Sequence, residues 1–408
     1  MSKKEFNSMS RNKIKLGVFG FGCVGEGLFD VLENNLGFKA EILKICVKNK
    51  GKKRRVNSGR ITFNKKDILD NPDINVVVEV IDNAEEAYEI AVEALTKGKA
   101  VVSANKKMIA ENLPELLLLQ DKFHTPLLYE AACCASIPLV RNFEEYYDND
   151  LLNSFSGIMN GTTNYILTEI FSRNKTYHEA LRLAQSKGYV ESNPALDLEG
   201  FDSKYKLTIL LTHAFGVTVK PDEIFNSGIG RLNNFDSKFA FERKCKIKLI
   251  ARAQKLNSGG IAAFVMPELV NETNELYAVD DVFNGIVTES SFADKNIFIG
   301  KGAGAFPTAS AVLSDISALS YNYRYEYKKK NQIANGFIDN NFFVDVYVRS
   351  DDPSKIDVIE FDEIYERYYS KEDNYLTGKI NFGKLIKSGW VNNSDVNVIL
   401  LNNKITML

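Results

Sequence analysis

The chain of 408 residues begins its first apolar pattern with KLGVFGFGCVGEGLFDVLENNL, residues 15–36. Lys15–Gly20 is a short apolar run typical of a strand, and Glu26–Leu36 has the spacing of a helix. Of the three glycines between them, the first permits a tight turn, the second lets backbone amides approach a pyrophosphate, and the third lets the helix lie close to the sheet. The pyrophosphate would bind at the helix N-terminus, where unpaired amides favour negative charge. The predicted dinucleotide-binding turn consists of Gly20, Phe21, Gly22, Cys23, Val24 and Gly25.

A basic loop follows the second predicted strand, Glu41–Val47. An NAD-selective site usually has an acid here, about 20 residues after the glycine turn, to bind the ribose hydroxyls. Lys48–Arg55 instead contains six basic residues among its eight, which suits an adenosine 2′-phosphate. The sequence therefore favours NADP(H) over NAD(H), although a solvated basic loop is an equal alternative for any single residue. The predicted phosphate contacts are Lys48, Arg54 and Arg55.

Further apolar runs alternate with helical spacing and predict a parallel, doubly wound α/β sheet. The strands are expected at Ile74–Ile81, Ala100–Ser103 and Pro126–Tyr129, with a helix at Ala84–Lys97. Ligands of such sheets bind outside the carboxyl ends of the strands. The segments that follow two of these ends are therefore candidates for the binding crevice: Ser103–Lys107 and Glu130–Pro138.

Composition excludes several classes of function. With 51 Lys and Arg against 53 Asp and Glu, the net charge of −2 gives no reason to expect nucleic acid or an anionic membrane as partner, so a small molecule is favoured. No apolar stretch is long enough to span a bilayer, and Met1–Asn12 lacks the apolar centre of a secretory signal. Five cysteines without metal-ligand spacing and three scattered histidines argue against a disulfide framework, a metal site or a Ser-His-Asp triad. We expect a cytoplasmic protein.

A second informative stretch reads GYVESNPALDLEGFDSKYK at Gly188–Lys206. It places several carboxylates in a loop before a predicted helix, on which Asp202 and Lys206 are four residues apart and hence on one face. Such a loop could hold a small cationic substrate and deliver a proton. The alternative is a solvated charged loop in which Asp202 stabilises the helix N-terminus.

Six segments in order resemble one family. They are GFGCVG at Gly20–Gly25, SANKK at Ser103–Lys107, YEAACCASIP at Tyr129–Pro138, GIMNGTTNYI at Gly157–Ile166, the stretch Gly188–Lys206 followed by LTIL, and GKGAGAFPTASAVLSDI at Gly300–Ile316. Together they span roughly residues 15 to 320 and closely resemble the homoserine dehydrogenases, which interconvert aspartate 4-semialdehyde and homoserine with NAD(P)H. The resemblance implies a monofunctional enzyme, because the nucleotide domain begins too near residue 1 for an aspartate kinase segment.

The resemblance also implies roles for individual residues. Lys206 corresponds to the family's catalytic lysine, the acid and base for the substrate oxygen, and Lys106 to a second lysine at the reacting centre and cofactor. The substrate contacts implied are Glu191, Asp202, Asp197, Tyr189, Gly161 and Thr162. Ser103 and Gly302 are implied at the cofactor. A monovalent cation, Na⁺ or K⁺, is implied at Glu130 and the backbone carbonyls of Cys133, Ala135 and Ile137.

One departure affects the cation loop. Many members of the family have a glycine pair where this chain has Cys134-Ala135-Ser136, which adds side chains beside the loop. The neighbouring thiols of Cys133 and Cys134 could suggest redox control, but small buried cysteines are the simpler interpretation.

Residues after about 325 change character. Asn341–Ser350 alternates like a strand, Ile356–Tyr369 could be helical, and Tyr375–Gly383 and Val396–Leu401 again look extended. The pattern resembles a shortened ACT regulatory domain. However, Asp351–Lys355 lacks the Pro-Gly turn expected at an ACT effector loop, so a purely structural or dimer-supporting tail is an equal alternative.

We therefore predict a Rossmann-type α/β domain at residues 1–145, with a return segment at 300–322. An α+β domain for substrate binding, catalysis and dimerisation is predicted at 146–299, and a small α+β module at 323–408. The resemblance implies a homodimer or higher homo-oligomer. Two rival functions stay open from the residues alone: a non-catalytic NADP sensor, which would not need both lysines, and a dehydrogenase for another amino-acid aldehyde.

Overall fold

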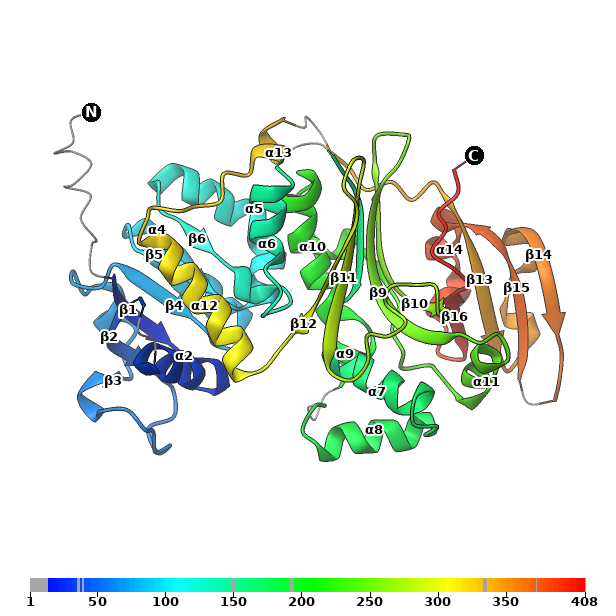
Figure 1. The fold of residues 1–408 in the computed structure, drawn as a ribbon, viewed down its shortest axis with the longest axis horizontal. Helices are drawn as coiled ribbons and strands as arrows, with labels where there is room; N and C mark the ends of the chain where they lie inside the picture. Colours follow the sequence, from blue (N-terminus) through cyan, green and yellow to red (C-terminus); the bar gives the residue numbers. More distant parts are fainter. Residues whose placement is uncertain are drawn as a thin grey trace. The chain divides into compact units, whose positions relative to one another are not determined.

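The structure is a computed structural model that describes residues 14–34, 37–38, 40–148, 151–190, 194–332, 336–371 and 373–407 (Figure 1). The chain forms two compact units, each built from two segments. The first unit contains Met1–Asp148 and Lys301–Lys328, and the second contains Asn149–Gly300 and Lys329–Leu408. Within the described ranges, no helix has the length and apolar character needed to cross a membrane.

The first unit is built on a six-stranded parallel sheet in the order β3-β2-β1-β4-β5-β6. This is the strand order of dinucleotide-binding domains, and it confirms the predicted Rossmann-type fold. The strands are β1 (Ile14–Phe19), β2 (Ala40–Cys46), β3 (Ile61–Thr62), β4 (Val76–Glu79), β5 (Ala100–Ser103) and β6 (Leu127–Leu128). The central strands are buried along their length, as expected when helices cover both faces.

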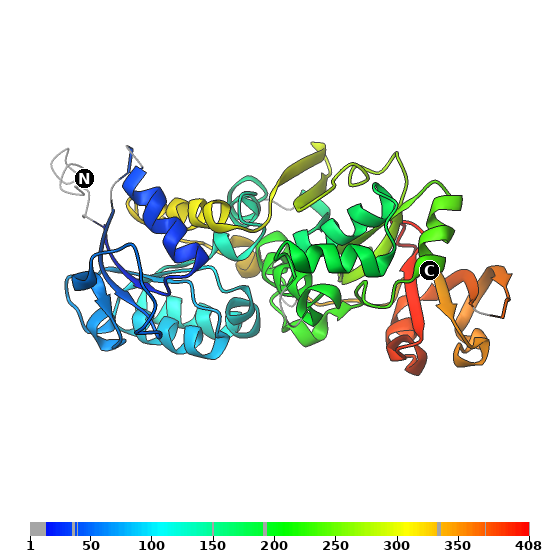
Figure 2. The same ribbon diagram turned by 90° about the horizontal axis from the view of Figure 1, so that it is seen from below.

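Helices connect these strands and cover the parallel sheet. The longer ones are α2 (Cys23–Asn34), α4 (Ala84–Thr96), α5 (Lys106–Phe123) and α12 (Ala305–Leu319), and the shorter ones are α3 (Lys66–Leu69) and α6 (Leu139–Arg141). The return helix α12 packs against α2, as Figure 2 shows in yellow and blue. The return segment Lys301–Lys328 therefore completes the first unit.

The second unit is built on a ten-stranded mixed sheet. Its order is β12-β11-β7-β9-β10-β16-β13-β15-β14, with β8 paired to β10. The first strands are β7 (Leu152–Ile158), β8 (Phe225–Asn226), β9 (Lys246–Lys255), β10 (Ile261–Val270), β11 (Phe283–Ser290) and β12 (Asp294–Lys301). The helices are α7 (Gly161–Phe171), α8 (Tyr177–Ser186), α9 (Ala195–Leu198), α10 (Phe201–Phe215), α11 (Asn234–Glu242) and α13 (Lys328–Gln332). Helices α7 and α10 pack on β9 and carry most of the candidate substrate site.

The tail contributes four antiparallel strands to this sheet, in the order fourth, first, third, second along the chain. They are β13 (Phe343–Ser350), β14 (Phe361–Tyr368), β15 (Asn374–Asn381) and β16 (Val396–Leu400). The short helix α14 (Phe382–Lys387) lies between β15 and β16 along the chain. The three extended segments predicted here are thus confirmed as β13, β15 and β16. The helix predicted at Ile356–Tyr369 is wrong, because single 3₁₀ turns lead into β14, whose backbone pairs with β15.

The tail shares a hydrophobic core with the rest of the second unit. Strand β16 pairs with β10, and Phe264 of β10 packs with Phe342 and Phe382 at ring-centroid distances of 6.0 and 4.8 Å. The tail is therefore part of the second unit, while its separate assignment as an ACT-like module remains a prediction.

A buried carboxylate ties the tail to α11. Asp236 is completely buried, and its Oδ1 accepts from the Tyr347 hydroxyl at 2.9 Å and from Arg349 Nε at 2.8 Å. Its Oδ2 accepts from the Asn233 amide at 3.0 Å and from Asn397 Nδ2 at 2.9 Å. Burial raises the pKa of this carboxyl, and the four donors offset that effect by stabilising its charge.

We predict that Asp236→Ala lowers the free energy of unfolding by about 3–5 kcal/mol, because it leaves the buried guanidinium of Arg349 with only a 3.4 Å contact to the Asp373 carboxylate. Urea unfolding followed by circular dichroism measures the change. The matched control is Lys107→Ala, which breaks an exposed ion pair with Glu111 and should have no measurable effect. An Asp236→Ala variant as stable as this control would contradict the prediction.

Candidate functional site

The glycine turn lies at the carboxyl end of β1. Gly20 has φ of 101°, a left-handed conformation that side chains rarely adopt, and a Cβ there would lie 2.7 Å from the Val80 carbonyl oxygen. A Cβ on Gly25 would lie 2.5 Å from the Gly20 oxygen, whereas one on Gly22 would meet nothing within 4 Å. The turn is thus closed on the protein side and open where a pyrophosphate would approach, directly before α2 begins at Cys23. These residues fit a dinucleotide.

The basic loop lies next to this turn. The Gly20 amide donates to the Cys46 carbonyl at 3.0 Å, which places the end of β2 beside the turn, and the loop starts two residues later. Lys48 pairs with Glu86, and Arg55 with Asp30 at 2.8 Å. Since exposed ion pairs contribute little, a phosphate can replace these carboxylates at small cost.

The neighbouring strand ends hold a buried acid that the sequence reading missed. Glu79, the last residue of β4, accepts from the Ser103 hydroxyl at 2.6 Å and from the Ile81 amide at 2.8 Å. Burial raises the pKa of Glu79 to about 7, although both hydrogen bonds act to lower it. The hydroxyl of Ser103, predicted at the cofactor, therefore has a carboxylate partner within the protein.

Two other predicted cofactor residues lie at helix starts in the first unit. Lys106 is half-buried and begins α5, behind the capping residue Asn105. Gly302 is half-buried and lies between β12 and α12.

The second unit holds Lys206 in a buried polar network. Its Nζ donates to Asp202 Oδ2 at 2.8 Å and to the Met159 carbonyl at 2.5 Å, and both charged side chains are only 5% exposed. This confirms that Asp202 and Lys206 share one face of α10. Asn160 extends the network, because its Nδ2 donates to Asp202 at 2.9 Å and to Asp197 Oδ1 at 2.7 Å. One network thus connects Asp197 of α9 and Asp202 of α10 with Lys206.

The helix α7 begins at the same network. Asn160 caps it, with Oδ1 accepting from the Thr163 amide, and Gly161 is its first residue. The Thr162 hydroxyl donates to the Tyr189 carbonyl at 2.9 Å. The structure therefore brings Asp197, Asp202, Lys206, Gly161, Thr162 and Tyr189 into connected segments of one unit. Glu191, the remaining predicted substrate residue, lies outside the described residues.

Sequence reasoning missed the role of Asn160 as the residue that joins two acids. Its position before a glycine at a helix start signalled only a helix cap. A capping asparagine uses its side-chain oxygen as an acceptor, so its side-chain NH₂ group can donate to other residues. The capping position of Asn160 was therefore the signal in the sequence that its NH₂ group could bind nearby acids.

In the predicted cation loop, backbone amides bind the carboxylate of Glu130. The Glu130 carboxylate accepts from the amides of Val140 and Arg141 at 3.0 and 2.9 Å. Burial raises the pKa of Glu130 to about 8. Cys134 and Ala135 have φ of 55° and 38°, the left-handed region that favours glycine. Among the described residues, no group of three or more His, Cys, Asp or Glu could hold a metal, so a cation here would depend on backbone carbonyls.

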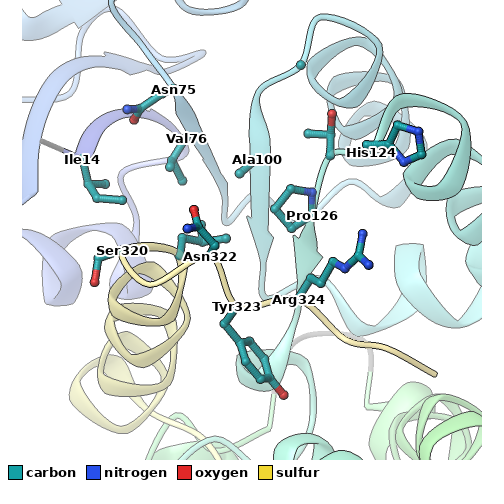
Figure 3. Close-up of a pocket in the computed structure, with 13 residues that line it drawn as sticks. Ile14, Asn75, Val76, Ala100, His124, Pro126, Ser320, Asn322, Tyr323 and Arg324 are labelled. Atoms are coloured by element: carbon teal, nitrogen blue, oxygen red, sulfur yellow. The ribbon is translucent and has the colours of Figure 1, made fainter. Parts of the chain in front are cut away.

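A pocket of about 590 Å³ lies at the opposite edge of the parallel sheet (Figure 3). Ile14, Val76 and Ala100, the first residues of β1, β4 and β5, line it, together with His124 and Arg324. Its lining in the described part of the chain includes none of the predicted site residues. Because dinucleotides bind at the carboxyl ends of the strands, this pocket is separate from the cofactor site.

Comparison with known proteins places this geometry in context. Residues 138–317 match a family model described as homoserine dehydrogenase, and residues 20–130 match its NAD binding domain. The homoserine dehydrogenase of Bacillus subtilis is 33% identical over 320 residues, 76% of this chain and 74% of the relative. A homoserine dehydrogenase structure from Thiobacillus denitrificans is 27% identical, with a TM-score of 0.84 over 96% of this chain and 99% of that chain. A hyperthermophilic archaeal homoserine dehydrogenase mutant in complex with NADPH is 25% identical, with a TM-score of 0.66 over 77% and 99% of the two chains.

We predict that the buried carboxyl of Glu79 makes the protein less stable as the pH rises. Its pKa is about 7 in the folded protein against an ordinary value of 4.5, so the folded state holds the proton more tightly. Its contribution is complete below about pH 4.5 and is lost as the pH rises to about 7. Glu79→Gln should remove this loss, about 3 kcal/mol across the window. Urea unfolding at several pH values measures it, and parallel curves for the two proteins would contradict the prediction.

Proposed function

The chain belongs to the homoserine dehydrogenase family, and from this premise we propose that Lys206 is the acid and base of its reaction, with Lys106 as a second cation at the reacting oxygen. The chain is an NAD(P)-dependent oxidoreductase that interconverts L-aspartate 4-semialdehyde and L-homoserine, in threonine, methionine and isoleucine biosynthesis. The observation that carries the proposal is a lysine ammonium, almost fully buried, that a carboxylate and a backbone carbonyl hold in one position.

The reaction requires a proton at the substrate oxygen whenever hydride moves. The bound nicotinamide supplies the hydride to the aldehyde carbon, or accepts it from homoserine. In the reductive direction, the Lys206 ammonium stabilises the negative charge that develops on the carbonyl oxygen and then donates a proton to it. In the oxidative direction, the neutral amine takes the hydroxyl proton. Asp202 and the Met159 carbonyl orient Nζ for both transfers.

The substrate contacts follow from the same network. Asp197 and Asp202 are held by one amide group of Asn160, so their carboxylates have fixed positions. We propose that these acids and Glu191 bind the cationic amino end of the substrate. Gly161, Thr162 and Tyr189 complete the proposed pocket through the start of α7 and the segment that Thr162 binds.

The cofactor is a nicotinamide dinucleotide, and we propose that NADP(H) is preferred. The support is the basic loop beside the glycine turn, which contains Lys48, Arg54 and Arg55, the proposed contacts of the 2′-phosphate. Ser103 and Gly302 are the other proposed cofactor contacts. We further propose a monovalent cation at the carbonyls of the Glu130 loop.

We also propose that the chain forms a homodimer or higher homo-oligomer through its second unit. Support comes from the edge strand β12, where Ile297 and Ile299 point to the same side and are 48% and 59% exposed. A reducing, cytoplasmic compartment is proposed because the chain has an odd number of cysteines, five, without metal-ligand spacing.

We predict that Lys206→Ala lowers kcat for homoserine oxidation by about 10²–10⁴-fold, because the hydroxyl proton loses its acceptor. Binding of NADP⁺, measured by fluorescence titration, should be unchanged. The control is Lys204→Ala on the same helix: this lysine is also buried, at 6% exposure, but lies over the Phe201 ring, and the variant should keep its activity. Full turnover by Lys206→Ala would refute the proposed role.

We predict that Arg54→Ala and Lys48→Ala each raise the KM for NADP⁺ about tenfold and leave the KM for NAD⁺ unchanged, because only NADP⁺ carries the 2′-phosphate. Initial rates with both cofactors measure this. Lys15→Ala is the control, since Lys15 pairs with Asp73 at the opposite edge of the sheet. If both KM values changed together, the loop would have another role.

A further inference from the structure

A second side chain holds the carbonyl that orients Lys206. Asn284, the second residue of β11, is completely buried, and its Nδ2 donates to the Met159 oxygen at 3.1 Å. The same oxygen accepts from Lys206 Nζ at 2.5 Å. We infer that Asn284 is a positioning residue for the reaction, which acts by fixing the Met159 carbonyl. The inference rests on the proposed role of Lys206.

The Met159 carbonyl needs such support because it lies where the sheet ends. The ladder between β7 and β11 ends with Ile158 opposite Gly285, so Met159 and Asn284 would form the next pair. On the other side, the ladder between β7 and β9 already ends at Gly157. The chain turns into α7 directly after Met159. The Asn284 side chain therefore supplies a hydrogen bond at the point where the regular pairing stops.

The backbone at Asn284 is itself anchored. Asn164 of α7 donates through Nδ2 to the carbonyls of Val279 and Phe283, each at 3.0 Å. Lys248 then donates to Asn164 Oδ1 at 3.0 Å and to Asp280 at 2.9 Å. The residue before Asn284 is thus fixed to the helix that begins beside the lysine. This anchoring gives the amide of Asn284 a defined direction.

The hydrogen bonds of Asn284 favour a role for its donor. With Nδ2 facing the Met159 oxygen, Oδ1 has no hydrogen-bond partner among the described residues. The opposite amide orientation would place two acceptors against each other, so the contact with Met159 decides the assignment. An unpaired buried acceptor costs stability. A leucine of similar size would avoid that cost, which indicates that the donor serves a purpose other than stability.

Loss of the Asn284 donor should displace the ammonium group of Lys206 and leave the affinity for the substrate unchanged. Without it, the peptide group of Met159 can rotate, and Nζ follows the oxygen that it binds. Displacement of a catalytic group by about 1 Å can lower the rate 10²-fold. Asp202 still holds the ammonium, and the acids of the substrate pocket keep their contacts with Asn160. The expected defect is therefore in kcat, with KM for homoserine unchanged.

We predict that Asn284→Ala and the nearly isosteric Asn284→Asp lower kcat for homoserine oxidation by about 10–100-fold, with KM for homoserine within about twofold of the wild type. Proton transfer should become more rate-limiting, so the solvent deuterium isotope effect on kcat should increase. Steady-state kinetics in H₂O and D₂O, together with NADP⁺ titration, measure these quantities on the full chain.

The matched control is Asn374→Ala, which removes a buried amide that donates to the Asp351 carbonyl at 2.9 Å in the tail. It should leave kcat and the isotope effect unchanged. If Asn284→Ala does not fold, Asn284→Asp decides the question. Unchanged kcat in the Asn284 variants, or a loss of kcat with an unchanged isotope effect and lost NADP⁺ binding, would overturn the inference. A wild-type protein without homoserine turnover would instead refute the proposed function.

Discussion

Burial of the Lys206 ammonium is the constraint on which the substrate site depends. A charge removed from water is stable only when a partner charge and hydrogen bonds replace its hydration. Here Asp202 supplies the charge and the Met159 carbonyl supplies a further acceptor. Because these groups come from α10 and from the end of β7, the lysine has a fixed position only after the helix has packed on the sheet. The geometry of the proposed acid and base is therefore a product of tertiary folding.

The first unit, with its glycine turn, depends on backbone conformation instead of buried charge. Its ligand is an anion, and the start of α2 already offers unpaired amides, so the unit needs close approach rather than charge. Gly20 meets this need by adopting a positive φ, and Gly25 by letting α2 lie against the turn. The two units thus bind their ligands in different ways. The first unit has glycines instead of side chains where the anionic dinucleotide approaches, whereas the second unit buries the charged side chains of Lys206 and Asp202 as an ion pair.

Local patterns predicted most of this arrangement, and long-range contacts account for what was missed. The glycine turn, the parallel sheet and the shared face of Asp202 and Lys206 follow from spacing along the sequence. Glu79 was missed because it stands within an apolar run, where only the fold shows that Ser103 is its partner. Asn284 was missed because its partner, Met159, is 125 positions away. The segment at β14 was assigned as a helix because its pairing with β15 is not visible in its own sequence.

Two of the buried ionic networks in the second unit, one around Asp236 and one around Lys206, differ in how many of their polar atoms have partners. Around Asp236, both carboxylate oxygens accept two donors each, so the network is saturated and can only hold the tail in place. Around Lys206, Asn284 Oδ1 has no partner in the described part of the chain. A folded protein gains nothing in stability from such unpaired groups. The unpaired oxygen agrees with the inferred role of Asn284, whose Nδ2 holds the Met159 carbonyl that orients Lys206.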